Sequence, residues 1–320
     1  MRLFEHPDFE QALIRAARHH GLSEQFIEKD YFITEILRIC VAELGEKVVF
    51  KGGTSLSKGW GLISRFSEDV DLFVNPALFD PPPGKNKINK ILKSLTESIA
   101  TYPPLDWRRE EGETIKGLGR NDVLAYESLF ADLPGLRSAI RLEPGIQSGT
   151  FPTSEEPITS LVTQYLKEAA VEDFLDLEDI EGFEMHLLHF RRTFVEKMFA
   201  LHGKVERLLG EDHPLGRDAR HYSDLHVLAD QHEVRSMLAS PEYEEIRRDY
   251  DERSRLFFPK AYRPPPGLSF KESPAFFSDP DLRARIEPEY ESECALLFSD
   301  QAFPTFEEIL ARFAEVRAVL

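Results

Sequence analysis

Two aspartates separated by one residue carry the clearest chemical signal in this chain of 320 residues. Asp69 and Asp71 lie in an apolar run that continues through residues 72–74 and predicts a strand. Because side chains two apart on a strand point the same way, both carboxylates face one side of the sheet. Two converging carboxylates repel each other unless a cation lies between them, and Mg²⁺ is the usual solution. The pair therefore predicts a magnesium site.

A glycine pair shortly before the aspartates predicts a site for a polyphosphate. The preceding apolar run predicts a strand, which ends in four residues suited to such a site: Gly52, Gly53, Thr54 and Ser55. Glycine allows a close approach of the backbone, and the N–H groups at the start of a helix bind anions. Lys58, one turn into that predicted helix, could reach the same anion, or it could be an ordinary surface residue. Together with the aspartates, the segment predicts a site for a metal–triphosphate complex.

The sequence of this segment resembles the AbiEii/AbiGii-type nucleotidyltransferase toxins, the toxin halves of bacterial toxin–antitoxin and phage-abortive systems. The resemblance rests on Phe50-Lys51-Gly52-Gly53-Thr54-Ser55 followed by Ser67-Glu68-Asp69-Val70-Asp71. It implies transfer of a nucleoside monophosphate from a nucleoside triphosphate (NTP) to an acceptor, with Mg²⁺ as cofactor. The implied acceptor is RNA, modified at the tRNA 3′ end, and the implied protein partner is a cognate antitoxin.

The resemblance also suggests a third carboxylate and further phosphate ligands. Nucleotidyltransferase sites often take a third metal-binding acid from a neighbouring strand. Glu143, at the end of the predicted strand 136–142, is the acidic residue best placed for this. The alternative is a glutamate on an edge strand in water. Lys51 and Arg65 join Lys58 as candidate cations for the triphosphate.

A second part of the resemblance lies downstream. Residues 196–201, Glu-Lys-Met-Phe-Ala-Leu, match a helix of the family, and Arg220 with Asp224 matches the helix that follows. This implies that Lys197 neutralises charge on the departing pyrophosphate, while Asp224 orients that lysine or touches the nucleotide. Arg220 is then a nucleotide ligand, and His221 stays in doubt. The alternative is an ion pair between two helices, which contributes little if it is exposed.

The composition argues against several classes of protein. A net charge of −18 is unlike that of a protein that coats nucleic acid, which would be basic. Residues 191–220 nevertheless hold seven basic and five acidic side chains, which is compatible with RNA nearby. With only two cysteines, free thiols in a reducing cytoplasm are expected. No apolar run approaches the roughly 20 residues that span a membrane, and the N-terminus lacks the apolar core of a signal peptide.

These motifs require an α/β (α+β) fold with a mixed sheet of the nucleotidyltransferase type and a mostly helical C-terminal part. Apolar spacing predicts helices at 8–20 and 24–44, with Ser23 as the N-cap of the second. Residues 110–120 predict an exposed loop, and residues 152–157 a linker. We therefore expect one domain at 1–150, with the N-terminal helices and the nucleotidyltransferase core. A second at 151–320 would be mostly helical and complete the cleft.

Two smaller expectations concern the flanks of the site. In the second helix, Lys29 and Asp30 predict a solvated face, while Tyr31 is expected to pack. Residues 232–320 predict further charged helices with no identifiable role.

Two other functions stay open at the level of the sequence. One is transfer of a nucleotide or phosphate to a protein hydroxyl. The other is a nucleotide-binding regulator without turnover. The intact set Asp69, Asp71 and Lys197 counts against the regulator.

Overall fold

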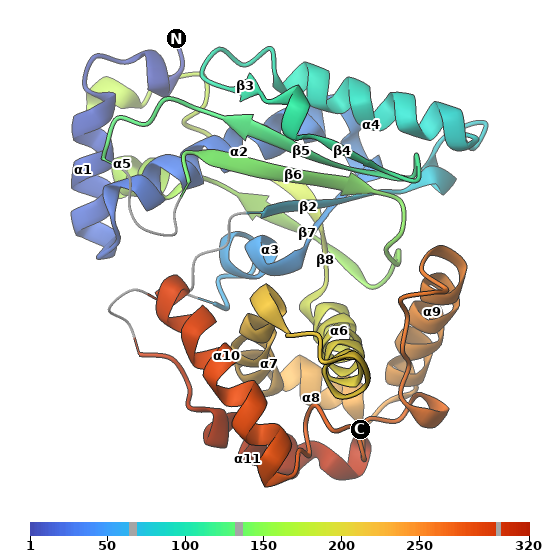
Figure 1. The fold of residues 1–320 in the computed structure, drawn as a ribbon. Coiled ribbons are helices and arrows are strands. Elements are labelled where there is room, and N and C mark those ends of the chain that lie inside the picture. Colours follow the sequence, from blue (N-terminus) through green and yellow to red (C-terminus); the bar gives the residue numbers. More distant parts are fainter. Residues whose placement is uncertain (64–68, 132–136, 299–301) are drawn as a thin grey trace. The chain divides into compact units, whose positions relative to one another are not determined.

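The predicted strand with the two aspartates lies in the middle of a mixed sheet (Figure 1). The computed structural model describes residues 1–63, 69–131, 137–298 and 302–320. Within these ranges the strands are β1 (Val48–Lys51), β2 (Asp69–Val74), β3 (Asp106–Trp107), β4 (Glu113–Ile115), β5 (Gly119–Ala125), β6 (Ala139–Gly145), β7 (Thr153–Ile158) and β8 (Phe183–Leu188). Their order is β3-β5-β6-β2-β1-β8-β7, and β4 pairs with β5.

The register around β2 places polar side chains in rows across the sheet. β1 runs antiparallel to β2 and aligns Lys51 with Asp71. β6 runs parallel to β2 on its other side and aligns Glu143 with Asp71, and Arg141 with Asp69. Because neighbouring strands lie about 4.8 Å apart, side chains aligned in this way on one face are close neighbours.

The helices around the sheet are α1 (Phe9–His20), α2 (Glu24–Leu44), α3 (Gly52–Lys58), α4 (Lys85–Ile99) and α5 (Leu161–Glu168). The predicted helix at 8–20 is confirmed, and it ends at Gly21, whose φ of 65° is left-handed. Ser23 caps α2 as predicted, because its side chain accepts a hydrogen bond from the Phe26 N–H. From α4, Ile88 and Leu92 pack with Val74, so this helix covers the sheet face opposite the acids.

Two polar segments form strands where the sequence predicted irregular structure. Residues 110–120 contain β4 and the start of β5, which pair antiparallel. Their turn passes through Lys116 and Gly117, both with positive φ, as a tight hairpin requires. Residues 152–157 lie largely in β7, at the end of the strand order. Both predictions were wrong because short edge strands are half-solvated and carry the polar composition of a loop.

The predicted solvated face of α2 is also wrong. Lys29 is fully buried, and its ammonium donates to the Arg137 carbonyl at 2.9 Å. Asp30 lies 2.7 Å from the Lys58 ammonium and accepts the Leu161 N–H at 2.7 Å. Charged residues usually mark a solvated helix face, but here partners distant in sequence satisfy the charges and let most of α2 be buried. Tyr31 packs as expected and is 1% exposed.

The rest of the chain is mainly helical. Its helices are α6 (Phe190–Glu211), α7 (His221–Ala229), α8 (His232–Leu238), α9 (Pro241–Phe257), α10 (Pro280–Phe298) and α11 (Phe306–Val316). One face of α6 is apolar and buried, with Phe194, Met198 and Leu201 all at 0% exposure. The predicted fold class is confirmed: a mixed α/β core is followed by a mostly helical part. Among the described residues, no helix has the length and apolarity needed to cross a membrane.

The chain divides into two compact units. The first, here called the sheet unit, comprises Met1–Gly59, Glu68–Ile146 and Ser154–Leu187. The second, the helical unit, comprises Leu188–Leu320 with the short segments Trp60–Ser67 and Gln147–Thr153. This division differs from the expected boundary after residue 150. The reason is that β8 pairs in parallel with β1, which ties residues up to 187 to the sheet.

Candidate active site

The paired aspartates lie at the start of β2, where the structure surrounds them with the neighbours that register predicts. Asp69 is 9% exposed, and a quarter of the Asp71 side chain is exposed. The Lys51 ammonium lies 3.6 Å from Asp71 Oδ1, across the β1–β2 pair. On the other side, Glu143 is the register partner of Asp71. A lysine and two carboxylates thus form one row, and Asp69 lies two residues along the strand.

The three carboxylates interact electrostatically. Burial, and then the negative charges of Asp71 and Asp69, together raise the pKa of Glu143 to about 7. A cation among these groups would relieve that repulsion, which is the property expected of a metal site. Across the described part of the chain, however, no three His, Cys, Asp or Glu side chains are grouped closely enough to hold a metal ion. The Mg²⁺ site therefore stays a prediction.

Gly52 fits the turn between β1 and α3 for two reasons. Its φ of +78° is left-handed, and a Cβ at this position would lie 2.1 Å from Asp71 Oδ2. Only glycine therefore lets the backbone pass so close to the acid. The helix α3 begins at this residue, so the backbone N–H groups of the turn start beside Asp71.

The hydroxyl groups of the turn are used within it. Thr54 is buried and donates a short hydrogen bond to the Asp69 carbonyl, which ties α3 to β2. Ser55 donates to the Gly52 carbonyl at 2.9 Å. These bonds fix the shape of the turn, so the backbone of Gly52, Gly53 and the next residues is its candidate anion ligand. Phosphate binding here stays a prediction.

Two further residues, Lys58 and Arg65, were predicted to bind phosphate. Lys58 is 4% exposed and forms an ion pair with Asp30 at 2.7 Å, and it also donates to the Thr159 carbonyl at 3.1 Å. A lysine enclosed in this way holds α2, α3 and the segment before α5 together. Arg65 lies outside the described residues.

The second predicted cluster is assembled within the helical unit. The Lys197 ammonium on α6 lies 2.9 Å from Asp224 Oδ2 on α7, and the two side chains are 7% and 0% exposed. The ion pair between two helices that the alternative interpretation named is therefore present, and it is buried rather than exposed. Burying two charges is costly unless they are paired and hydrogen-bonded, so the structure must hold them here with good geometry.

His221, which the sequence left in doubt, belongs to the same cluster. Its Nδ1 lies 3.0 Å from the Lys197 ammonium, and its Nε2 lies 3.5 Å from Asp218 Oδ1. Asp218 in turn contacts the Lys204 ammonium at 2.7 Å. Burial, and then the Lys197 charge, lower the pKa of His221 to about 4, so the imidazole is neutral near pH 7.

Sequence reasoning could have found this extension of the cluster. Asp218, His221 and Asp224 are spaced by three residues, which places them along one helical face. Arg220 is half-buried. Its predicted contact with a nucleotide stays a prediction.

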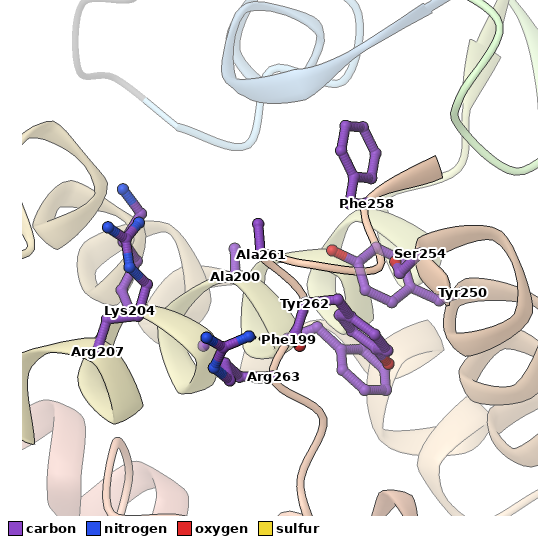
Figure 2. Close-up of a pocket in the computed structure, with 11 residues that line it drawn as sticks. Phe199, Ala200, Lys204, Arg207, Tyr250, Ser254, Phe258, Ala261, Tyr262 and Arg263 are labelled. Atoms are coloured by element: carbon purple, nitrogen blue, oxygen red, sulfur yellow. Dashed lines mark hydrogen bonds between the residues drawn. The ribbon is translucent and has the colours of Figure 1, made fainter. Parts of the chain in front are cut away.

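The helical unit also has a pocket of about 190 Å³ beside α6. Figure 2 shows Lys204 and Arg207 on one side of it and the rings of Tyr250 and Tyr262 on the other. Phe199 stacks on Tyr250, with ring centroids 4.5 Å apart. The three cationic side chains that line this pocket have acidic partners. Lys204 contacts Asp218, and both Arg207 and Arg263 contact Glu211.

The sheet unit has a larger pocket, of about 350 Å³, next to the aspartates. Asp69 lines it, together with three arginines, Arg108, Arg137 and Arg141. Asn121 and the small residues Ala125 and Ala139 contribute to its floor, and Glu111 and Glu113 also line it. This set is called the arginine pocket below.

Comparisons with known proteins identify a matching family and a similar fold. A family model described as "Nucleotidyl transferase AbiEii toxin, Type IV TA system" matches residues 35–312. Among solved structures, the fold is similar to MenT4, a nucleotidyltransferase toxin from Mycobacterium tuberculosis, with a TM-score of 0.59 and 15% sequence identity. That match covers 96% of this chain and 88% of the other. No curated protein matches the sequence.

Proposed function

The chain belongs to the AbiEii family of nucleotidyltransferase toxins of type IV toxin–antitoxin systems, and we propose that it transfers a nucleoside monophosphate from an NTP to the 3′ end of an RNA, with tRNA as the acceptor. The observation that supports this most is the polar row of Lys51, Asp71 and Glu143, with Asp69 beside it and Gly52 against Asp71. Family membership establishes the nucleotidyltransferase class, and the acceptor and the metal are the proposal.

In the proposed reaction, the 3′ hydroxyl of the RNA attacks the α-phosphorus of the NTP. An O–P bond to the RNA forms, the bond to the β-phosphate oxygen breaks, pyrophosphate leaves and the hydroxyl proton passes to water. Asp69 and Asp71 would hold Mg²⁺ as a pair of carboxylates, with Glu143 as the proposed third acid, and the ion would supply charge stabilisation for the attacking and leaving oxygens. The backbone of Gly52 and Gly53 binds the triphosphate, and Lys51 supplies a positive charge next to Asp71.

The cluster of the helical unit supplies a second set of roles. Lys197 is proposed to neutralise charge that develops on the pyrophosphate. Asp224 and the neutral His221 hold its ammonium in position at 2.9 and 3.0 Å. Arg220 is proposed as a further ligand of the nucleotide.

Membership of a type IV system implies an antitoxin partner. A cognate antitoxin is therefore proposed as the protein partner of this chain.

The acceptor can be tested by following the label. The chain is incubated with each α-³²P-labelled NTP, Mg²⁺, purified tRNA and the protein fraction of a bacterial lysate. We expect label in RNA with at least one NTP, and sequencing of RNA ends should locate it at the 3′ terminus. Label in protein would replace this proposal with transfer to a protein hydroxyl. Absence of label from both fractions with every NTP would contradict it and favour a regulator without turnover.

A further inference from the structure

The arginine pocket lies on the same sheet face as the proposed catalytic acids. Asp69 is aligned with Arg141 on β6, and Arg141 is aligned with Val123 on β5. The pocket thus extends from Asp69 across two neighbouring strands.

The position of the pocket relative to the glycine turn is informative. β2 carries the acids and lies between β1 and β6 in the sheet. The turn at Gly52 follows β1, on one side of β2, whereas the pocket lies over β6 and β5, on the other. A ligand in the pocket and a triphosphate at the turn would therefore approach the acids from opposite sides.

Phosphoryl transfer requires that arrangement. The attacking oxygen and the leaving oxygen lie roughly in line on opposite sides of the phosphorus. If pyrophosphate departs towards the glycine turn, the attacking hydroxyl must come from the side of the arginine pocket. We infer that this pocket binds the acceptor RNA strand next to its 3′ end, an inference that rests on the proposed function.

The chemistry of the pocket suits a phosphodiester backbone. Guanidinium groups bind phosphate oxygens through paired hydrogen bonds. The side chains of Arg108 and Arg141 are 47% and 42% exposed. Their ion pairs with acidic side chains are weak, because Arg108 lies 3.1 Å from an exposed Asp106 and Arg141 lies 4.0 Å from Glu143. Both guanidinium groups can therefore turn towards a ligand at small cost.

The floor of the pocket leaves room for a sugar or base. Ala125 and Ala139 are aligned across the β5–β6 pair, so the side chains that the described residues place there are small. Asn121 offers both a donor and an acceptor for hydrogen bonds. Glu111 and Glu113 face the same space and would repel a strand that strayed towards them.

The phosphates could instead be those of the NTP, so the test separates the two sources. Three variants of the full chain are compared with the parent: Arg108→Gln, Arg137→Gln and the triple variant that adds Arg141→Gln. Lys93→Gln on α4 is the control, because it removes one exposed charge from the same unit. Fluorescence anisotropy gives the Kd for a short 5′-fluorescein-labelled single-stranded RNA over a range of salt concentrations, without NTP. A fluorescent NTP analogue gives the Kd for nucleotide in parallel.

We expect the triple variant to bind RNA about tenfold more weakly or worse, with nucleotide affinity at the parental level. The slope of log K against log salt should fall by about 0.7 for each phosphate contact removed. The control should match the parent in both assays. Unchanged RNA affinity in the triple variant, or weaker binding of nucleotide alone, would overturn the inference.

The binding assay needs no turnover, so it is independent of the proposed reaction. A parent chain that labels RNA while the triple variant still binds RNA normally would refute the pocket and leave the reaction standing. A parent chain that binds RNA through these arginines but transfers no label would refute the reaction alone.

Discussion

Gly52 shows at the scale of one residue how closely the backbone and the acids are fitted. We predict that Gly52→Ala lowers the transfer rate at least about 100-fold, because the new Cβ would lie 2.1 Å from Asp71 Oδ2 and displace that carboxylate. Gly210→Ala is the matched control. A Cβ at Gly210, within α6, meets nothing within 4 Å. Gly210→Ala should leave the transfer rate unchanged and add about 0.5–1 kcal/mol to the free energy of unfolding. Equal rates for the two variants would show that Asp71 need not be held there.

His221 makes a prediction about pH. Its pKa is lowered from 6.5 to about 4 by burial and then by Lys197. The unfolded chain therefore takes up this proton near pH 6.5, while the folded chain does so only near pH 4. The stability that the neutral imidazole supports is complete above pH 6.5. It is lost as the pH falls towards 4, by on the order of 2–3 kcal/mol.

Denaturant unfolding across this pH range checks the prediction. His221→Gln should flatten the fall in the free energy of unfolding relative to the parent. The exposed His213 serves as the control, and His213→Gln should keep the parental pH dependence. A parental slope in His221→Gln would mean that the imidazole is not held neutral by the fold.

At the scale of elements, one buried ion pair joins α2 to α3 and the segment before α5. Lys58→Met leaves the Asp30 carboxylate without its lysine in a buried site, and we predict a loss of about 3 kcal/mol in stability. The KM for NTP should stay within about twofold of the parent. Lys93→Met, which breaks a half-exposed pair with Glu97, should cost less than about 0.5 kcal/mol. A raised KM with normal stability would instead restore Lys58 as a phosphate ligand.

The elements around the site could be predicted wherever local pattern decides structure. The bounds of β2 follow from apolar alternation, and α1 and α2 follow from their spacing and their caps at Gly21 and Ser23. The shared face of the two aspartates follows from the period of a strand. The proximity of Glu143 depends on the pairing of β2 with β6, which the resemblance suggested and the register confirms.

The features that the sequence did not reveal depend on partners distant in the chain. Lys29 is buried and Asp30 is mostly enclosed because a carbonyl at residue 137 and the ammonium of Lys58 meet them there. The strands β4 and β7 form because each pairs with a neighbouring strand of the sheet, and their sequences carry no apolar pattern that would predict a strand. His221 joins Lys197 only because α6 and α7 pack together. Each case is a tertiary contact that overrides a local signal.

At the scale of the whole molecule, the net charge of −18 opposes general binding of nucleic acid. Any affinity for RNA must therefore come from local groups such as the arginine pocket, and salt should weaken it. Family membership establishes the nucleotidyltransferase class, and the polar row on β2 is the proposed location of that activity.

The central claim is that the acids of β2 carry out nucleotidyl transfer, and the rate of transfer in Asp71→Asn tests it most directly. The parent, Asp71→Asn and Lys93→Gln are assayed under one set of conditions with labelled NTP and tRNA, after circular dichroism shows that all three are folded. We predict that Asp71→Asn loses at least about 100-fold in rate, because the amide removes the charge that would hold the metal, while Lys93→Gln matches the parent. A folded Asp71→Asn that labels RNA at the parental rate would contradict the account.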